Sequence, residues 1–564
     1  MLAEDGSALQ GVTVTLKGAG TPQNFVTDRR GEFHFLNLDP ADDYALRLDL
    51  TGFAVVERRG VAVAVGVNTS IRVAMKQAAV EASVTVVGDA PLLDPRRVGT
   101  GATIERREMD TIPSARDPWA AVQTVPGVLV DKVNVGGNYS GQASGFIAKG
   151  SQTSQGSWNL DGATISDMAV AASSPTYWDF DSFQEIQAVT GGSDPSIATS
   201  GVTLNLVTRR GTNRTRGSAR VFVTDSAFQA KPTLSEEEKR QQEAGGGATP
   251  FVGNQITGIQ DYGIEIGGPV LKDRLWLWGS YGRQQIDLLA VTGQPDKTTI
   301  EDINAKATFQ AIESNGLTVF YLRGDKRKSG RGASPTRPPE TTQLQSGPTS
   351  LYKMEDSQVF SSKVVVEAFW SFLDENFRTV AAGGPAPQAF LDADSVWHNS
   401  YRSNYVGRPQ HQVSGSVNYF LSTGALGHEL KAGGGVRRVE ARSETVWPGQ
   451  GIIAYAQGSG TCSGGDPPAL IACGAITRNA STRDKDDYVN FFFSDTITQA
   501  RLTATLGVRY DDQKGSIQSS SVPANALYPT ILPAASAPAI DGVVHWKDWS
   551  PRAGLTYAIG DARE

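Results

Sequence analysis

The chain has 564 residues, of which 39% are hydrophobic, so it is long enough for several domains and can bury substantial cores. Lys and Arg number 52 against 59 Asp and Glu, and the formal net charge of -7 argues against a nucleic-acid-binding protein. No run of about 18 apolar residues occurs, which excludes transmembrane helices but leaves open membrane spans built from alternating strands.

The start of the chain and its cysteines bear on the cellular compartment. Met1 to Asp5 show no basic region followed by an apolar stretch, so no signal peptide is visible and the true N-terminus stays open. Only 2 cysteines are present, Cys462 and Cys473, in a stretch rich in Gly, Pro and Asp. We expect a loop disulfide formed in an oxidising compartment, and two free thiols are the alternative.

Residues 1–79 are predicted to form a small β-sandwich. Apolar and polar residues alternate at 12–17, 33–36, 44–50 and 61–67, and turn signals recur about every ten residues. The order Gly11-Val12-Thr13-Val14, then Thr27-Asp28 with Gly31, then Gly52-Phe53 resembles the carboxypeptidase-regulatory-like domain.

An enzymatic role is not expected. A zinc carboxypeptidase needs a His-x-x-Glu pair and a further ligand, and none of the 5 histidines has Glu at the third following position. The sequence also lacks a Gly-x-Ser-x-Gly elbow and a phosphate-binding loop. We therefore expect no catalytic residues, no metal and no cofactor.

Residues 80–215 are predicted to form a compact α/β domain. Asp117 is suited to cap a helix that begins at Pro118, and Pro126-Gly127 would end it. Three fragments follow in order: Asn159-Leu160-Asp161-Gly162, then Phe183 to Gly192, then Gly201 to Asn213. Together they resemble the plug domain of TonB-dependent outer-membrane receptors.

A short β-prone segment, Val84-Thr85-Val86-Val87-Gly88, lies between the sandwich and the plug. The resemblance implies that it stands where the TonB box belongs, the segment on which the periplasmic protein TonB pulls. A strand can join a partner's sheet edge through main-chain bonds, so its side chains matter little. The alternative is a simple interdomain strand.

Residues 216–564 alternate apolar and polar side chains in many segments, for example 304–311, 412–419 and 502–510. One apolar and one polar face is typical of a transmembrane barrel, although a soluble antiparallel sheet has the same pattern. Tight turns alternate with long polar connections at 227–257, 329–350, 447–483 and 513–543, which favours an outer-membrane barrel.

Several strand sequences resemble one branch of these receptors, the Oar-like branch: Gly267 to Tyr281, Leu506 to Asp511 and Trp549 to Tyr557. The family closes its barrel with 22 strands, whereas about a dozen can be counted here. We therefore expect a fragment that lacks the end of the barrel. Aromatic residues near predicted strand ends would form an interfacial girdle, with ordinary core positions as the alternative: Trp276, Trp278, Tyr281, Tyr419, Phe420, Trp546, Trp549 and Tyr557.

The expected fold is therefore mainly β, with an N-terminal sandwich, an α/β plug and an incomplete antiparallel transmembrane barrel in the bacterial outer membrane. The resemblance implies import of an extracellular substrate by plug movement, coupled to the TonB-ExbB-ExbD complex, with outer-membrane lipid around the barrel and no nucleic acid. Siderophore, oligosaccharide and peptide stay open as substrates. The alternative function is adhesion or protein transport at the outer membrane.

Overall fold

The computed structural model covers the whole chain. It describes residues 1–564 except 4–6, 37, 39, 65–68, 70, 78–82, 88–98, 143, 168–169, 171–172, 175, 193, 199–200, 231–234, 238–239, 241–254, 291–292, 335, 425, 457–472 and 560–564.

The N-terminal sandwich consists of a five-stranded sheet and a two-stranded sheet that enclose one core. The larger sheet has the order β3-β2-β4-β5-β7, and the smaller one pairs β1 with β6. Val12, Val14 and Leu48 are fully buried in this core, because every second residue of a strand faces the same side. The strands are β1 (Leu2–Ala3), β2 (Thr13–Lys17), β3 (Gln23–Val26), β4 (Ala41–Asp49), β5 (Val55–Val63), β6 (Ala74–Met75) and β7 (Ser83–Val87).

One predicted strand of the sandwich is wrong. Residues 32–36 are not a strand, although Phe33 and Phe35 pack against the core as expected. Phe35 lies edge-on to Phe25 of β3 at 6.3 Å between ring centroids. The backbone nearby is held by Asp28, whose carboxylate accepts hydrogen bonds from the Arg30 and Glu32 amides. Phe33 and Phe35 thus fill space in the core, although their backbone does not pair with a neighbouring strand.

The plug is a mixed five-stranded sheet, ordered β12-β11-β14-β13-β8, with two short helices and a separate β9–β10 pair. Asp117 caps α2 by accepting the Ala120 amide at 2.8 Å with Pro118 in the first turn, which confirms the predicted helix start. The elements are β8 (Thr100–Glu105), α1 (Arg106–Thr111), α2 (Pro118–Val122), β9 (Val128–Val130), β10 (Phe146–Ala148), η1 (Thr153–Gln155), β11 (Ser157–Leu160), β12 (Ala163–Thr164), η2 (Phe180–Ser182), β13 (Phe183–Gly191) and β14 (Thr203–Thr208).

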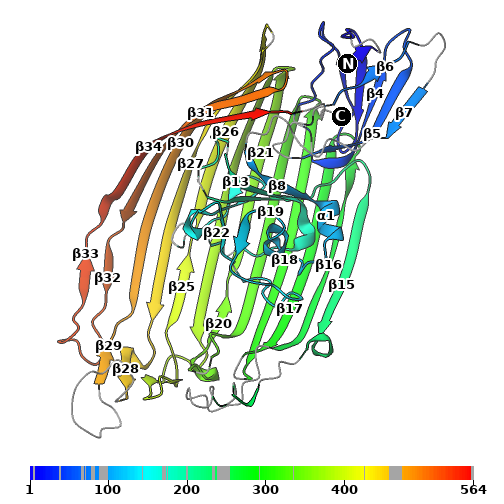
Figure 1. The fold of residues 1–564 in the computed structure, drawn as a ribbon. Helices are drawn as coiled ribbons and strands as arrows, with labels where there is room; N and C mark the ends of the chain where they lie inside the picture. The colour runs from blue at the N-terminus through cyan, green and yellow to red at the C-terminus, as the bar shows by residue number, and fades with distance from the viewer. Residues whose placement is uncertain are drawn as a thin grey trace.

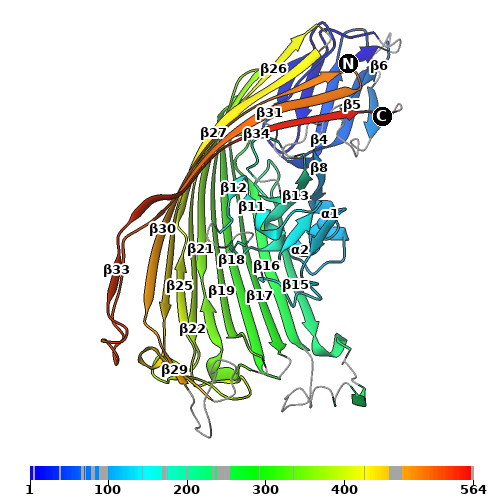
Figure 2. The ribbon, with the colours of Figure 1, turned by 60° about the vertical axis from the view of Figure 1, so that its left-hand side comes forward.

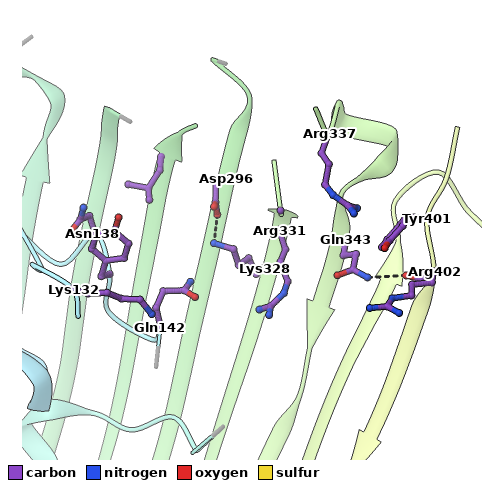
Figure 3. A pocket seen from close by; sticks show the side chains of 13 residues that line it. Lys132, Asn138, Gln142, Asp296, Lys328, Arg331, Arg337, Gln343, Tyr401 and Arg402 are labelled. Atoms are coloured by element: carbon purple, nitrogen blue, oxygen red, sulfur yellow. Dashed lines mark hydrogen bonds and ion pairs between the residues drawn. The ribbon is translucent and has the colours of Figure 1, made fainter. Parts of the chain in front are cut away.

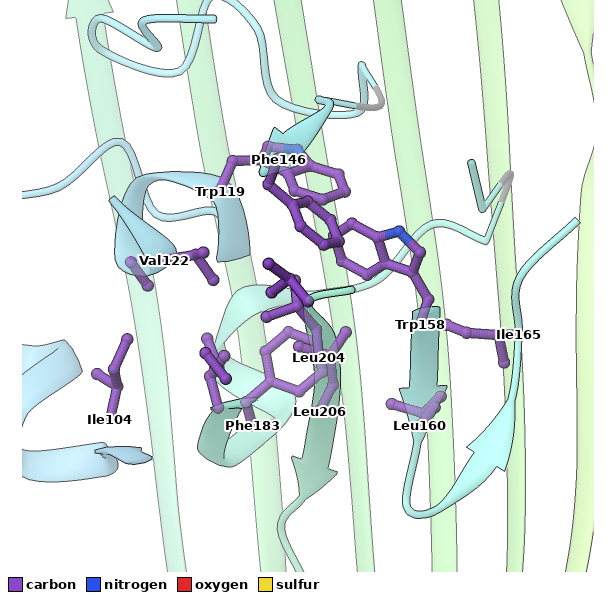
Figure 4. Close-up of a cluster of buried hydrophobic side chains, with 14 of the residues drawn as sticks. Ile104, Trp119, Val122, Phe146, Trp158, Leu160, Ile165, Phe183, Leu204 and Leu206 are labelled. Atoms are coloured by element: carbon purple, nitrogen blue, oxygen red, sulfur yellow. The ribbon is translucent and has the colours of Figure 1, made fainter. Parts of the chain in front are cut away.

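The plug has a core of its own, centred on aromatic rings (Figure 4). Trp158 is fully buried, with Trp119 edge-on at 4.2 Å and Phe146 at 4.9 Å between ring centroids. Such edge-to-face contacts add about 0.5–1.5 kcal/mol each to the burial of the rings. The plug therefore has the interior expected of an independently packed unit.

Most of the remaining strands form one 14-stranded antiparallel sheet that curves around the plug (Figures 1 and 2). Among the described residues its outermost strands, β15 and β34, are not paired with each other. The strands are β15 (Arg216–Asp225), β16 (Gln255–Leu271), β17 (Leu275–Leu289), β18 (Pro295–Ile312), β19 (Asn315–Arg331), β20 (Gln343–Ser346), β21 (Pro348–Ser361), β22 (Val364–Ala381), β25 (Ser403–Gly407), β26 (Gln410–Thr423), β27 (Leu426–Val446), β30 (Ala480–Gln499), β31 (Leu502–Ile517) and β34 (Ile540–Tyr557).

The two faces of this wall differ as the alternation predicts. In β18, Asp302, Asn304 and Lys306 are buried on the concave side, whereas Ile303 and Phe309 are exposed on the convex side. An apolar outer belt around a polar interior is the arrangement of an outer-membrane barrel.

The predicted aromatic girdle is only partly correct. Trp549 and Tyr557 are exposed at outward-facing positions of β34, whereas Trp546 shares the inward face of β34 with Arg552. Trp276 and Trp278 are almost fully buried. Both lie at positions of β17 that face inward, because Leu277 between them is exposed and side chains alternate. The Trp276 indole N–H donates to the Asn213 side chain and that of Trp278 to Glu265, each at 2.8 Å.

The two rims of the wall also differ (Figure 1). Tight turns after β16, β18, β26 and β30 lie near the sandwich, and Thr21 and Arg30 of the sandwich donate to carbonyls of two of these turns, Asp273 and Gly424. The opposite rim carries longer connections, which confirms the predicted asymmetry. Their small elements are η3 (Ser226–Phe228), η4 (Pro339–Thr341), β23 (Ala389–Leu391), β24 (Trp397–His398), η5 (Gly449–Gly451), β28 (Ile452–Tyr455), β29 (Cys473–Ile476), β32 (Ser520–Val522) and β33 (Ala535–Ala537).

No helix in the described part of the chain is long and apolar enough to cross a membrane. The division of the chain into residues 1–79, 80–215 and 216–564 stays a proposal, and β7, which falls in the second range, pairs with the sheet of the sandwich.

The aromatic core of the plug allows a test of its independence. Trp158→Ala should destabilise the plug by about 3–5 kcal/mol, because it removes a fully buried ring. Trp158→Phe should cost less than about 1.5 kcal/mol, since it retains most of the volume and removes an indole N–H that has no partner. Thermal melting would show the difference, and retained heat-modifiable migration of the barrel on gels is the control. Equal losses for both variants would contradict this account of the core.

Candidate functional site

The expected coupling segment lies at the edge of the sandwich. β7 (Ser83–Val87) pairs in parallel with β5, with Val55 opposite Ser83 and Arg59 opposite Val87. In the described part of the chain the other edge of β7 has no strand beside it. Gly88, the last residue of the predicted segment, lies outside the described residues. The structure thus places an accessible strand edge where the resemblance puts the TonB box, and that role stays a prediction.

The predicted loop disulfide involves the rim that carries the long connections. Cys473 opens β29, which pairs with β28 through Tyr455, and Cys473 is disulfide-bonded. Cys462 lies outside the described residues, so the pairing of the two cysteines stays a prediction.

The plug is held against the wall by buried ion pairs. Arg220 of β15 contacts Asp179 at 2.5 Å and Asp181 at 2.9 Å, both in or next to η2 of the plug. Its Nε also lies 3.0 Å from Asp261 of β16, a wall residue. Arg116 of the plug joins the same group, 2.6 Å from Asp181. Buried charges are tolerated only when they are paired in this way.

The arginines of this group lower the pKa of the Asp181 carboxyl. Burial would raise the pKa of this carboxyl, but Arg220 and then Arg116, which surround it, lower the pKa to about 2. Asp181 also pairs with Arg106 of α1 at 2.9 Å. The carboxylate therefore stays charged over the whole physiological range and links the plug to the wall.

A second group of contacts forms at the Asp161-Gly162 turn. Asp161 has a positive φ of 47°, and its carboxylate accepts the Thr208 amide at 2.8 Å. Lys306 of β18 lies 2.8 Å from the same carboxylate, and Lys353 of β21 donates to the Asp161 carbonyl at 2.5 Å. Burial would raise the pKa of Asp161, but Lys306 and Lys353 outweigh it and the pKa is lowered. A turn that is weak as a sequence signal is thus an anchor between plug and wall.

Further wall cations bind plug carbonyls directly. Arg509 of β31 donates to the Pro195 and Ser196 carbonyls, both at 2.9 Å, and Lys326 of β19 donates to the Gly141 carbonyl at 2.6 Å. Arg552 of β34 does the same at Ile197, at 2.8 Å. Charge-assisted hydrogen bonds of this kind are stronger than neutral ones and can be broken without exposing apolar surface.

The plug also approaches the wall where the wall has no side chain. A Cβ atom on Gly324 of β19 would lie 2.2 Å from the Tyr177 carbonyl oxygen, and one on Gly507 of β31 would lie 2.4 Å from Cγ of Pro195. Glycine is therefore required at both positions for the plug to sit as it does.

The main apolar cluster shared by plug and wall lies at one patch. Phe320 and Leu322 of β19, Leu351 of β21 and Leu373 of β22 join the plug core from the wall. Most of the other contacts named above are polar, so the interface resembles a separable surface more than a continuous core.

None of these anchors was found from the sequence. A single Arg or Lys in a strand matches no motif, and its partners lie far away along the chain. The sequence offers one signal, which is alternation: Lys306 and Lys353 each lie between two apolar residues and therefore take inward-facing positions of their strands.

A cavity of 530 Å³ opens between the plug and the wall near the rim with the long connections (Figure 3). It is bordered on the plug side by the loop from Lys132 to Gln142 and on the wall side by the ends of β17, β18 and β19 and the segments that follow. Its polar lining is rich in cations. The lining residues are Lys132, Asn138, Tyr139, Gln142, Leu288, Asp296, Lys328, Arg331, Gly332, Arg337, Gln343, Tyr401 and Arg402.

Three arginines of the cavity have no carboxylate partner. Arg331, Arg337 and Arg402 form no ion pair with any residue in the described ranges, whereas Lys328 pairs with Asp296. Arg337 lies over the Tyr401 ring at 4.0 Å from its centroid, and Arg402 lies over the same ring at 5.7 Å. Cation–π contacts hold these guanidinium groups in place without neutralising their charge.

Comparison with known proteins identifies the architecture. A family model for the TonB dependent receptor-like β-barrel matches residues 274–563, more than half of the chain. The chain belongs to the TonB-dependent receptor family. Models for an outer membrane β-barrel domain and for a carboxypeptidase regulatory-like domain match residues 207–292 and 2–76 of this receptor. Family membership places the receptor in the outer membrane.

The receptor is 28% identical to the TonB-dependent transporter Oar of Myxococcus xanthus over 282 residues, which are 48% of this chain and 24% of that protein. This match therefore spans about a quarter of Oar. Among solved structures, the receptor resembles the open form of the ferric-catecholate import receptor Fiu from Escherichia coli K12, with a TM-score of 0.56, 13% identity, and coverage of 83% of this chain and 68% of that one.

The outer membrane transporter YddB of Escherichia coli is similar at a TM-score of 0.54 and 12% identity, with coverage of 75% of this chain and 60% of that one. These structural matches show that the fold of the receptor is that of plugged outer-membrane barrels.

The low pKa of Asp181 predicts acid sensitivity of the plug. Because the folded pKa of about 2 lies below the usual value of 3.8, the carboxylate stabilises the plug above about pH 4, and this stability is lost as the pH falls toward 2. Asp181→Asn should cost about 2 kcal/mol at pH 7 and flatten the loss of plug stability between pH 4 and 2.

Asp110→Asn is the matched control. Asp110 also pairs with Arg106, at 2.6 Å, but its side chain is 52% exposed, so its loss should cost less than about 1 kcal/mol. Thermal melting of the purified receptor from pH 2 to 7 measures both effects. Similar losses in the two variants would contradict the role of the buried ion pairs.

Proposed function

We propose that this receptor imports an anionic ligand, bound in the cavity at the plug, by plug movement that the TonB-ExbB-ExbD complex drives. The observation that carries the proposal is the set of unpaired arginines: Arg331, Arg337 and Arg402 face one cavity with no carboxylate of the described chain to neutralise them. An anionic ligand would supply the missing charge.

The size and lining of the cavity support the same conclusion. Its 530 Å³ lies within the range of about 300–1,000 Å³ that is typical of sites for small ligands. The lining contains five cationic side chains and a single carboxylate, Asp296, which Lys328 already binds. Tyr139 and Tyr401 add aromatic surface for a ligand with planar groups.

Ferric complexes are the first ligands to test. Among the structural relatives, Fiu is named as a ferric-catecholate import receptor and FecA as a ferric citrate transporter. Complexes of iron with acidic chelators carry the negative charge that the cavity lacks.

The edge of β7 supports coupling to TonB. A partner strand can join a strand edge through main-chain bonds alone, and β7 is the last strand of the sandwich before the chain continues to the plug. We propose that Val84 to Gly88 form this coupling segment and that the receptor, like other members of a family of transporters and receptors, performs no catalysis.

A role in adhesion or protein transport is the alternative. It is favoured by the small sheet of β23, β24, β28 and β29 and the β32–β33 hairpin, which add structured surface to the rim opposite the sandwich (Figure 1). Dependence of ligand uptake on TonB separates the two functions.

The cavity is tested by replacing two of its arginines. Arg337→Gln combined with Arg402→Gln should weaken binding of ferric citrate or a ferric catecholate at least about 100-fold, because each lost charge-assisted bond is worth about 1.5–3 kcal/mol. Quenching of tryptophan fluorescence by the iron complexes would measure the affinity. Arg378→Gln is the control, since Arg378 also stacks on a tyrosine, Tyr405, but is exposed on the other face of β22.

An equal loss of affinity in the Arg378 control would remove the assignment of the cavity. If neither iron complex bound the unmodified receptor, ferric complexes would be ruled out as its ligands.

The coupling segment is tested by deletion. Removing Val84 to Gly88 should abolish energised uptake but leave ligand binding and the barrel intact, because the sandwich and the plug each retain their own cores. Val86→Pro should act similarly, since proline removes a main-chain donor, and Val86→Ile should have little effect.

Uptake of iron-55 complexes by intact cells provides the measurement. Normal accumulation after the deletion would refute the assignment of the segment, and uptake in cells without TonB would favour the adhesion or protein-transport alternative.

A further inference from the structure

One buried carboxyl group of the wall has no partner. Both side-chain oxygens of Glu375 in β22 are buried without a hydrogen bond, and the residue is 1% exposed. A charged carboxylate without any hydrogen bond is costly in such a place, so burial favours the neutral carboxyl. A polar group left unsatisfied in this way costs stability and calls for a functional reason.

Glu375 lies next to an ion pair that joins plug and wall. Arg408, between β25 and β26, donates its backbone N–H to the Glu375 carbonyl at 2.8 Å, and its guanidinium contacts Asp167 of the plug at 3.2 Å. Both side chains of this pair are nearly buried, at 6% and 5% exposure. Glu375, Asp167 and Arg408 thus form one group with two acids and one base.

Arg408 belongs to the wall and would stay there if the plug moved. Its guanidinium donates to the Gly407 and Arg442 carbonyls at 2.9 and 2.6 Å and to the Ser443 hydroxyl at 3.2 Å. These partners are all neutral wall groups. Among the described residues, Asp167 is its only ion-pair partner, so loss of the plug would leave a buried cation alone.

The ion-pair group around Arg220 differs, because its cation keeps a partner within the wall. Arg220 pairs with two plug carboxylates, but it also pairs with Asp261, which belongs to the wall and would remain after the plug moved. Arg408 has no such second pair in the resting structure, and Glu375 is the wall carboxyl that could provide one.

We propose that Glu375 is the reserve counter-ion of Arg408, which replaces Asp167 when this part of the plug leaves the wall. The Glu375 carboxyl then gives its proton to water entering the space, and the resulting carboxylate pairs with the guanidinium. The charge of the wall stays balanced in both states, which lowers the cost of plug movement.

The proposal is tested by a double-mutant cycle on the full receptor in detergent, which needs neither the ligand nor TonB. Asp167→Asn alone should lower the melting midpoint of the plug only modestly, because Glu375 takes over, and Glu375→Gln alone should leave it unchanged or slightly raised. The double variant should melt at least about 5 °C below the sum of the single shifts, since Arg408 then has no counter-ion.

Emission of the Trp119–Trp158–Trp178 cluster follows the plug, and heat-modifiable migration shows that the barrel is still folded. The matched control is the cycle of Asp179→Asn with Asp302→Asn. Asp302 is another buried wall acid with an unpartnered oxygen, but Arg220 keeps Asp181 and Asp261, so these shifts should add. Additive shifts at Asp167 and Glu375, or equal synergy in the control, would overturn the proposal.

If the double variant does not fold, Arg408→Met is added to Asp167→Asn and Glu375→Gln, and the folding of this triple variant tests the proposal. Removing the unpaired cation should restore a folded plug, and failure of this triple variant to recover would also overturn the proposal.

Discussion

The structure depends on one electrostatic constraint: a cation buried between the wall and the plug must find an anion or a carbonyl, because burial removes the water that would otherwise solvate its charge. The plug meets this requirement with Asp161, Asp167, Asp179 and Asp181 and with the carbonyls of its loops. Position, orientation and depth of the plug follow from these partners. The wall therefore recognises the plug mainly through charge, while the apolar core of the plug makes its fold independent of that recognition.

This division of tasks explains how a domain can be held firmly and yet be removable. Trp119, Phe146 and Trp158 belong to the plug alone, so parting the two units leaves this core intact. The wall side chains around Phe320 and Leu373 would lose most of their apolar contact with the plug. Ion pairs, in contrast, can be exchanged one at a time for water or for other charges, and the barrier to separation is spread over many small steps.

Much of the fold followed from the sequence, because it rests on local periodicity. The alternation in β18, β26 and β31, the helix start at Asp117 and the tight turns at one rim are local features, and all are found in the structure. Two predictions are wrong for the same reason: the strand at residues 33–36, and the outward placement of Trp276 and Trp278. Alternation alone does not say whether a backbone finds a pairing partner, or which of the two faces points inward. The ion-pair groups and the cavity arginines were beyond reach, since they join residues that lie up to hundreds of positions apart.

The two glycine contacts limit how the plug can leave. Gly324 and Gly507 lie on β19 and β31, well separated around the wall, and each admits plug atoms so closely that a single methyl group would collide. If the plug rotated about the barrel axis as a rigid body, Tyr177 and Pro195 would move from these glycines toward the neighbouring strands. The residues beside Gly324 and Gly507 on those strands carry side chains, which would collide with the plug. The two glycines of the wall therefore fix the orientation of the plug inside it. Rotation as a rigid body is blocked at both points together, so the plug is fixed in its angle about the barrel axis as well as in its depth.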